Sequence, residues 1–409
     1  MLNFIWIFFF TTAFIVALIK LFAFGDTEIF GQLMTAMFSL SKTAFEISLG
    51  LTGILALWLG IMRIGERSGF IDLLTRGLTP LFSKLMPEVP KNHPALGAMV
   101  MNISANALGL DNAATPLGIK AMKELQKLNP FKDTASNAQI LFLVINTSAV
   151  TLFPVTIFTY RAQMGSANPT DVFIPILIAT YASTLVGLLT VASVQKINLF
   201  DKVIMSYLGG FTLLVIGLLS YFSNLPQADM LAQSALISNV ILFSLVMLFI
   251  SGAVFKKVNA YEAFIDGAKE GFETAITIIP YLVAMLVAIG VFRASGALDL
   301  LAGGLRQLVL AMNVDDRFID ALPTALMKPF SGSGARAMMV DTMQTYGADS
   351  FAGRLSSIVQ GSTETTFYVL AVYFGSVGIK NIRHAAACGL AADIAGIIAA
   401  ITVAYWFFG

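Results

Sequence analysis

Residues 99–120 read Met99-Val-Met-Asn102-Ile-Ser104-Ala-Asn106-Ala-Leu-Gly109-Leu-Asp111-Asn112-Ala-Ala-Thr115-Pro116-Leu-Gly118-Ile-Lys120. This segment is too polar to face lipid but apolar enough to lie at membrane depth. Non-helical backbone at that depth is tolerated only where protein or a wet cavity covers it. The segment therefore predicts a re-entrant hairpin. Because an N-cap residue precedes a proline at Thr115-Pro116, we expect a helix from about there to Lys127.

A second segment has the same character and reads Pro323-Thr-Ala-Leu-Met-Lys328-Pro329-Phe330-Ser331-Gly332-Ser333-Gly334-Ala-Arg336. Ser-Gly-Ser-Gly can turn successive backbone N–H groups toward one point, and a helix over 335–346 is expected to follow. Two helix N-termini that meet at the midplane favour a carboxylate, a phosphate or an electron-rich carbonyl. The alternative is a pair of ordinary surface loops.

The composition around these segments is that of an integral membrane protein. Of 409 residues, 57% are apolar and only 12% are charged, whereas soluble proteins average roughly 25% charged residues. One cysteine, Cys388, excludes an intrachain disulfide, and two histidines leave little for zinc. We therefore expect no metal and no cofactor.

Hydropathy predicts an all-α fold with nine transmembrane helices. They are expected near 3–24, 44–62, 138–160, 172–195, 204–222, 235–255, 273–292, 355–378 and 385–408. Segments 63–94 and 120–132 are rich in Lys and Arg, whereas 223–234 contains neither. Basic loops stay in the cytoplasm. The N-terminus is therefore expected inside and the C-terminus outside.

Parts of the sequence recur 227 residues apart. Ser68-Gly69-Phe-Ile-Asp72-Leu-Leu74 matches Ser295-Gly296-Ala-Leu-Asp299-Leu-Leu301, and Lys42-Thr-Ala-Phe-Glu46 matches Lys269-Glu-Gly-Phe-Glu273. An odd number of spans separates the two copies, so they are expected to be inverted in the membrane. Inverted repeats with interrupted segments at matching positions are typical of secondary transporters. The amphipathic stretches 68–86 and 295–312 are expected to be interfacial helices that carry the hairpins.

Polar residues within the spans are the candidate site. Glu364 lies inside the span 355–378, and an ionisable group at that depth is a functional candidate by default. Glu364 and Asp111 are the candidates for ion or proton coupling. For Asp111, capping of the next helix is an equal alternative, and Arg336 with Asp341 could form either a solvated pair or a pair that braces the hairpin. The candidate solute-binding residues are Asn102, Asn106, Asn112, Thr115, Asn146, Thr147, Ser148, Ser331, Ser333, Gln360, Ser362 and Thr363.

The run Asn102 to Met122 resembles spore maturation protein A. The strings Ala263 to Glu273, Pro329 to Gly334 and Gln360 to Tyr368 resemble spore maturation protein B. The chain resembles a fusion of the two, with an A-like half at 1–200 (gate domain about 42–195) and a B-like half at 201–409 (gate domain about 269–408). Each half is similar to the gate or nucleoside-recognition domain that nucleoside transporters also contain. The resemblance implies a bacterial inner-membrane protein with a transport-like core.

These features predict a secondary transporter of a small polar organic solute, either nucleoside-like or an amino acid or carboxylate, with sodium or a proton as a possible coupling ion. A homo-oligomer is possible, and no nucleic acid is expected as a partner. The alternative is a non-transporting scaffold for envelope or spore-cortex maturation. An enzyme is not expected, because no nucleophile with a nearby histidine base is readable.

Overall fold

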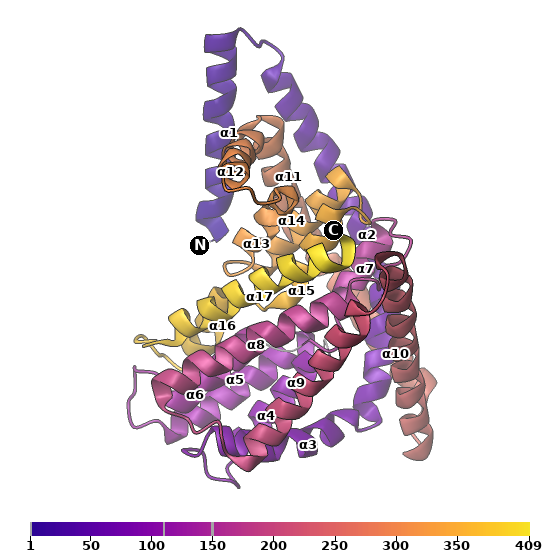
Figure 1. Ribbon diagram of the computed structural model, residues 1–409, viewed down its shortest axis with the longest axis vertical. Helices are drawn as coiled ribbons and strands as arrows, with labels where there is room; N and C mark the ends of the chain where they lie inside the picture. The colour runs from indigo at the N-terminus through magenta and orange to yellow at the C-terminus, as the bar shows by residue number, and fades with distance from the viewer. Residues whose placement is uncertain (1, 109–110, 149–150) are drawn as a thin grey trace.

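The computed structural model describes residues 2–108, 111–148 and 151–409. Within them the regular structure is helical, apart from one β-bridge between Thr134 and Asn381, so the all-α fold is confirmed (Figure 1). The first half contains α1 (Leu2–Phe24), α2 (Ile29–Arg67), α3 (Phe70–Leu85), α4 (Pro94–Ala107), α5 (Asp111–Leu128), α6 (Asn137–Thr147), α7 (Val155–Gln163) and α8 (Phe173–Gln195). The second contains α9 (Lys202–Ser223), α10 (Gln227–Phe255), α11 (Ala260–Ala294), α12 (Ala297–Ala311), the 3-10 helix η1 (Arg317–Ala321), α13 (Leu322–Met327), α14 (Gly332–Tyr346), α15 (Phe351–Ser362), α16 (Thr366–Gly375) and α17 (Ala385–Phe408).

Seven helices of the described chain are long and apolar enough to cross a membrane, namely α1, α2, α8, α9, α10, α11 and α17. Large apolar side chains on α1 and α9 face outward, and Phe22 is 81% exposed and Leu213 70% exposed. A contiguous apolar surface of this kind is expected to contact lipid. The chain is therefore a multi-pass membrane protein.

Seven of the nine predicted spans correspond to these helices, but the predictions for 138–160 and 355–378 were wrong as continuous helices. The first is divided into α6 and α7, and the second into α15 and α16. Pro154, which has no backbone N–H, directly precedes α7. Thr363 has an extended backbone (φ −147°, ψ 170°), which ends α15. Hydropathy alone does not register such interruptions.

Two helices begin earlier than the sequence predicted. Helix α5 begins at Asp111 and contains Pro116, whereas we expected it to begin at about Thr115. Helix α14 begins at Gly332 rather than at 335, because Ser331 is its N-cap: Ser331 Oγ accepts a hydrogen bond from the Gly334 N–H at 3.0 Å. Both changes shorten the segment between the paired helices.

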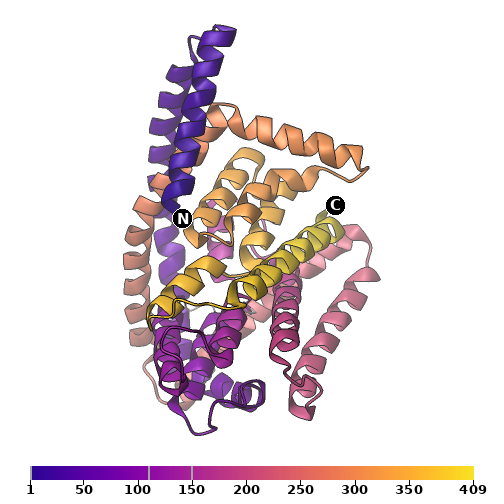
Figure 2. The same cartoon turned by 90° about the vertical axis from the view of Figure 1, so that its left-hand side faces the viewer.

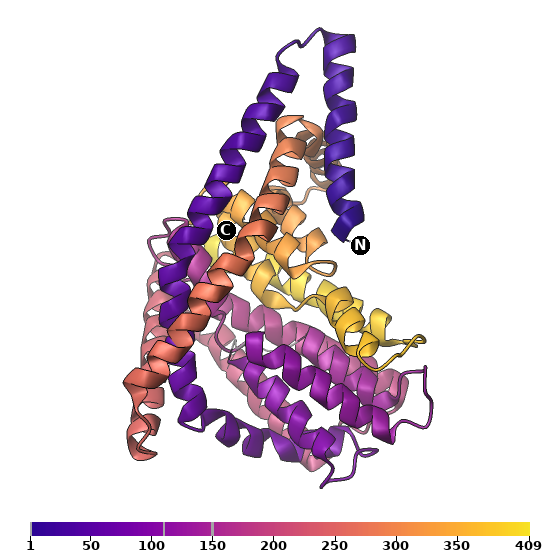
Figure 3. The same ribbon diagram turned by 180° about the vertical axis from the view of Figure 1, so that it is seen from behind.

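Helices α2 and α11 pack along one another, as Figure 3 shows from behind. Helix α11 faces α2 with small buried residues at every fourth position, Ala263, Gly267, Gly271 and Ala275. A Cβ at Gly267 or Gly271 would collide with the backbone of α2 at Leu59 or Ala56. Small residues at this spacing allow two helix backbones to approach closely within a membrane.

The junctions α2–α3 and α11–α12 are built alike. Gly69 (φ 78°) and Gly296 (φ 85°) each precede the second helix in a left-handed conformation that glycine adopts without strain. The serine before each glycine donates to a carbonyl three residues back, Ser68 to Gly65 at 2.7 Å and Ser295 to Phe292 at 2.8 Å. Helices α3 and α12 coincide within two residues with the predicted amphipathic stretches 68–86 and 295–312. Figure 2 shows α12 leading away from the end of α11.

Helices α8 and α17 cross the middle of the molecule together (Figure 1). Helix α8 packs on α6, and α17 packs on α15 and α16. The two interrupted helix pairs therefore lie against a common support of two continuous helices.

Candidate functional site

Three backbone hydrogen bonds bring four interruptions of the chain together. The N–H of Leu152, between α6 and α7, donates to the carbonyl of Ala107 at the end of α4 at 2.9 Å. In the other half, the N–H of Phe367 donates to the carbonyl of Pro329, between α13 and α14, at 3.0 Å. The third bond joins the halves: the N–H of Glu364 donates to the carbonyl of Thr147 at 2.7 Å. The backbone at these interruptions is thus hydrogen-bonded inside the protein, which is what non-helical backbone at membrane depth requires.

A cavity of about 80 Å³ lies at this junction. This volume is below the roughly 300–1,000 Å³ of most ligand pockets. It is lined by Thr151, Phe153, Pro154, Val155, Thr156, Ile157, Tyr160, Lys328, Gly332, Arg336, Met339, Gln360, Gly361, Thr363 and Glu364.

The cavity wall contains cations, a carboxylate and an uncompensated amide oxygen. Lys328 is 3% exposed, and the guanidinium of Arg336 lies 5.8 Å from the ring centre of Tyr160. Glu364 contributes the carboxylate. The side-chain oxygen of Gln360 is buried without a hydrogen-bond partner among the described residues. Both charge signs and an open hydrogen-bond acceptor therefore surround one small volume.

Three residues of the predicted site, Gln360, Thr363 and Glu364, line this cavity. Three predicted asparagines form a separate network instead. Asn106 donates to the Asn146 side chain at 2.8 Å, and Asn102 donates to the Ala114 carbonyl at 2.7 Å and to the Tyr373 hydroxyl at 3.2 Å. Their amide N–H groups thus already donate to protein acceptors.

The other predicted residues whose side chains the structure describes do not line the cavity. Ser148 and Ser362 donate to carbonyls of their own helices, Ser331 caps α14, and the Ser333 hydroxyl lies 3.3 Å from that of Ser331. Thr147 is fully buried and Thr115 is half-buried. The side chains of Asp111 and Asn112 lie outside the described residues.

Sequence reasoning did not include Lys328, Arg336 and Tyr160 in the site. The two cations flank the Ser-Gly-Ser-Gly string, and that position was the signal that could have found them. Asp341, which was suggested as the partner of Arg336, instead pairs with Arg293 of α11. Arg336 instead faces the cavity and Tyr160.

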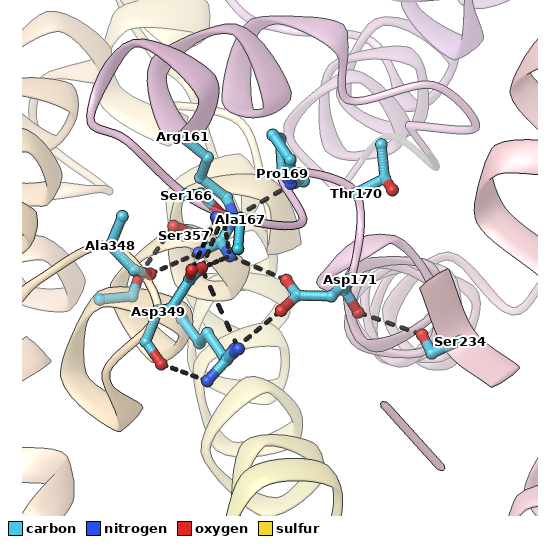
Figure 4. Close-up of polar contacts among 12 residues, drawn as sticks. Arg161, Ser166, Ala167, Pro169, Thr170, Asp171, Ser234, Ala348, Asp349 and Ser357 are labelled. Atoms are coloured by element: carbon cyan, nitrogen blue, oxygen red, sulfur yellow. Dashed lines mark hydrogen bonds and ion pairs between the residues drawn. The ribbon is translucent and has the colours of Figure 1, made fainter. Parts of the chain in front are cut away.

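A buried ion cluster holds the two halves together on one side of this junction (Figure 4). Arg161, which is fully buried at the end of α7, donates to Asp171 at 2.8 Å, to Asp349 at 2.9 Å and to the Ala348 carbonyl at 2.8 Å. Arg354 of α15 donates to the second oxygen of Asp171 at 2.8 Å. We call Arg161, Asp171, Asp349 and Arg354 the Arg161 cluster. Its charges are all paired, which indicates a structural role.

The fold and the site define a multi-pass helical membrane protein with a buried polar junction between interrupted helices. The Gate family, described as nucleoside recognition, matches residues 48–164 and 275–380, which together exceed half of the chain. The chain belongs to this family.

Two curated relatives come from Bacillus subtilis (strain 168). The chain is 51% identical to spore maturation protein B over 154 residues, which are 38% of this chain and 85% of the relative. It is 47% identical to spore maturation protein A over 148 residues, which are 36% of this chain and 76% of the relative. The resemblance to both proteins is thereby confirmed. No solved structure matches the chain.

Proposed function

We propose that the protein is a secondary membrane transporter of a small polar organic solute, which binds in the cavity at Glu364. The observation that carries the proposal is that backbone hydrogen bonds join four chain interruptions, three of which line one polar cavity. Transporters bind solutes near the midplane between discontinuous helices, where half-helix ends and unwound backbone supply polar contacts. In this proposal the solute crosses unchanged, without a chemical reaction.

We further propose that the two halves are inverted repeats and that the helix pairs α4–α5 and α13–α14 are re-entrant hairpins. The like-built junctions at Gly69 and Gly296 support the repeat. So do the paired backbone bonds from Leu152 to Ala107 and from Phe367 to Pro329. The proposed setting is the bacterial inner membrane, with the N-terminus in the cytoplasm and the C-terminus outside.

The charges of the cavity favour an amino acid or carboxylate solute over a nucleoside. Lys328 and Arg336 suit a carboxylate, and Glu364 with the Gln360 oxygen suits an ammonium or hydroxyl donor. A cavity of about 80 Å³ also favours a small solute, because a nucleoside would require the junction to open widely.

The test is ligand-dependent thermal stability of the purified protein against amino acids, dicarboxylates, short peptides and nucleosides. A ligand that binds only the folded state stabilises it by about 2.7 kcal/mol at a concentration of 100 times Kd. We expect a concentration-dependent rise of the midpoint with an amino acid or carboxylate. The rise is lost in Glu364→Gln and Lys328→Gln and retained in Glu262→Gln, which removes an exposed carboxylate of α11. Solute uptake into proteoliposomes should likewise be lost in Glu364→Gln and Lys328→Gln and retained in Glu262→Gln.

A second candidate function is a scaffold for envelope or spore-cortex maturation. The names of the two relatives, spore maturation proteins A and B, favour it. The same experiment separates the two candidates. If no ligand of the panel shifts the midpoint and the cavity variants retain biological activity, the scaffold function holds and the transporter is rejected.

A further inference from the structure

A second polar cluster lies behind the interruption at Glu364, on the face of α17 that contacts α15 and α16. At its centre is Asp393, which is 1% exposed. The Thr366 hydroxyl donates to one oxygen of its carboxylate at 2.7 Å. Asp393 does not line the cavity described above, but Thr363 of this cluster does, so the cluster adjoins the cavity from the side of α17.

Two glycines of α17 allow side chains of other helices to pack closely against the face of α17 that carries Asp393. Gly389 and Gly396 lie four residues before and three residues after Asp393, so all three share one side of the helix. A Cβ at Gly389 would lie 2.7 Å from the Thr366 methyl group and 3.6 Å from that of Thr147. A Cβ at Gly396 would lie 2.6 Å from the Thr363 methyl group, 3.1 Å from the Ser183 Cβ and 3.3 Å from the Ser362 carbonyl oxygen. Hydroxyl side chains from α6, α8 and the α15–α16 interruption therefore converge on this side of α17.

Several oxygens of this cluster have no hydrogen-bond partner of acceptable geometry among the described residues. They are Thr147 Oγ1, Ser183 Oγ, Thr363 Oγ1 and Asp393 Oδ1. Each belongs to a residue that is at most 3% exposed. Of these, the Thr363 hydroxyl lies near enough to the Asp393 carboxylate to stabilise its charge. Buried polar groups are nearly always paired, so the open positions that remain on Asp393, Thr147 and Ser183 indicate an unassigned partner. The partner must interact favourably with oxygen atoms and, when Asp393 is ionised, with its negative charge.

The helix ends at this place favour a cation as that partner. Helix α6 ends at Thr147 and α15 ends at Ser362, so both present the negative ends of their dipoles here. Half-helix C-termini and unwound carbonyls coordinate sodium in transporters with discontinuous helices. A set of hydroxyls with a single carboxylate suits a monovalent cation, whereas calcium sites commonly contain several carboxylates.

We propose that Asp393, Thr363, Thr147 and Ser183, together with the Ser362 carbonyl, form a binding site for sodium. Binding at this site does not depend on the proposed transport, but a role for the ion in coupling does rest on that function. The charges of Glu364 and Lys328 act on Asp393 from the cavity side, so an ion beside Asp393 would influence the solute cavity electrostatically. The sequence suggested Glu364 and Asp111 as candidates for ion coupling, whereas this proposal assigns the ion site to Asp393.

The experiment compares the thermal midpoint of the full-length protein in sodium, potassium and choline chloride at constant ionic strength. We expect a saturable rise with sodium and none with choline. Asp393→Asn should abolish the rise. Thr363→Val and Ser183→Ala, which remove single hydroxyls with little change in volume, should each weaken apparent sodium affinity at least tenfold. Asp229→Asn at the start of α10 should retain the wild-type response.

Two results would overturn the site. One is an equal midpoint in all three salts, as expected if a proton or Lys328 alone compensates Asp393. The other is a sodium response that persists in both hydroxyl variants, which remain informative if Asp393→Asn does not fold. A sodium response without any solute response would retain the ion site and reject the proposed transporter, so the two failures can be told apart.

Discussion

The backbone N–H of Glu364 donates to the carbonyl of Thr147 at 2.7 Å, and this bond joins the interruption of α15–α16 to that of α6–α7. The carbonyl of Thr147 lies at the end of α6, where no further helical turn supplies an N–H donor. At this point of contact, a backbone N–H of the second half thus forms a hydrogen bond with a backbone carbonyl of the first half. The same residue, Glu364, directs its side chain to the cavity.

Glu364→Pro should destabilise the protein more than Glu364→Ala does. Both variants remove the carboxylate, but only proline removes the N–H that reaches Thr147. A buried hydrogen-bonding group left unpaired costs about 1–3 kcal/mol, so we expect a lower thermal midpoint for the proline variant. Equal midpoints for the two variants, measured in the same detergent, would show that the bond contributes nothing to stability.

Loss of Arg161 should be among the most destabilising single changes in the chain. Arg161→Met removes the cation that pairs with Asp171 and Asp349 and leaves Asp171 buried beside Arg354 alone. Breaking a buried ion pair on one side costs about 3–5 kcal/mol. The thermal midpoint measures the loss, and Arg161→Lys should lose less because it keeps the charge.

The matched control for Arg161 is Lys42→Met, which breaks the pair of Lys42 with Glu46. These side chains are 78% and 59% exposed, and exposed pairs contribute about 0–1 kcal/mol. If the control lowers the midpoint as much as Arg161→Met does, burial does not explain the effect.

The sequence allowed the junctions at Gly69 and Gly296 to be predicted, because the repeated Ser-Gly and the amphipathic stretches after it are local patterns. The division of α6 from α7 and that of α15 from α16 were missed, because the flanking residues are apolar and hydropathy averages across the breaks. Local signals were present in Pro154 and in the run Gly361 to Thr366, whose β-branched and small residues have low helix propensity.

The candidate site could be predicted only in part, for a physical reason. Glu364 can be recognised from the sequence because it is an acid within an apolar span. That pattern is local and does not depend on knowing which distant residues contact it. The Arg161 cluster and the proposed sodium site at Asp393 each depend on contacts between residues far apart in the chain, such as Arg161 with Asp349. No periodicity or spacing within a single sequence specifies such contacts.

Gly267→Leu should disrupt the packing of α11 on α2. Its added side chain would meet the backbone carbonyl of Leu59, which has no flexible end that could move aside. Overpacking of a tight contact costs about 1–3 kcal/mol or more, so the midpoint should fall. Gly303→Ala is the control, because nothing lies within 4 Å of its Cβ position in α12. Alanine there should leave stability unchanged or raise it by about 0.5–1 kcal/mol. A fall of similar size in both variants would contradict close packing at Gly267.

The loop after α12 should make a small pH-dependent contribution to stability through Asp315. Hydrogen bonds from the side chain and backbone of Arg317, with one from the Tyr405 hydroxyl, lower the pKa of Asp315 to about 2. Because the folded-state pKa lies below the unfolded value, the contribution is fully present well above about pH 4 and is lost as the pH falls toward 2. The side chain is 43% exposed, so water screens the pair and its contribution stays below about 1 kcal/mol.

The measurement is the difference in thermal midpoint between wild type and Asp315→Asn from pH 7 to pH 2. We expect a constant difference down to about pH 5 and a shrinking one below it. In an Arg317→Gln background the substitution should change the midpoint much less, because the main donor to the carboxylate is already absent. A difference that stays the same at every pH would mean that asparagine acts through shape or hydrogen bonding and that the charge of Asp315 is not involved.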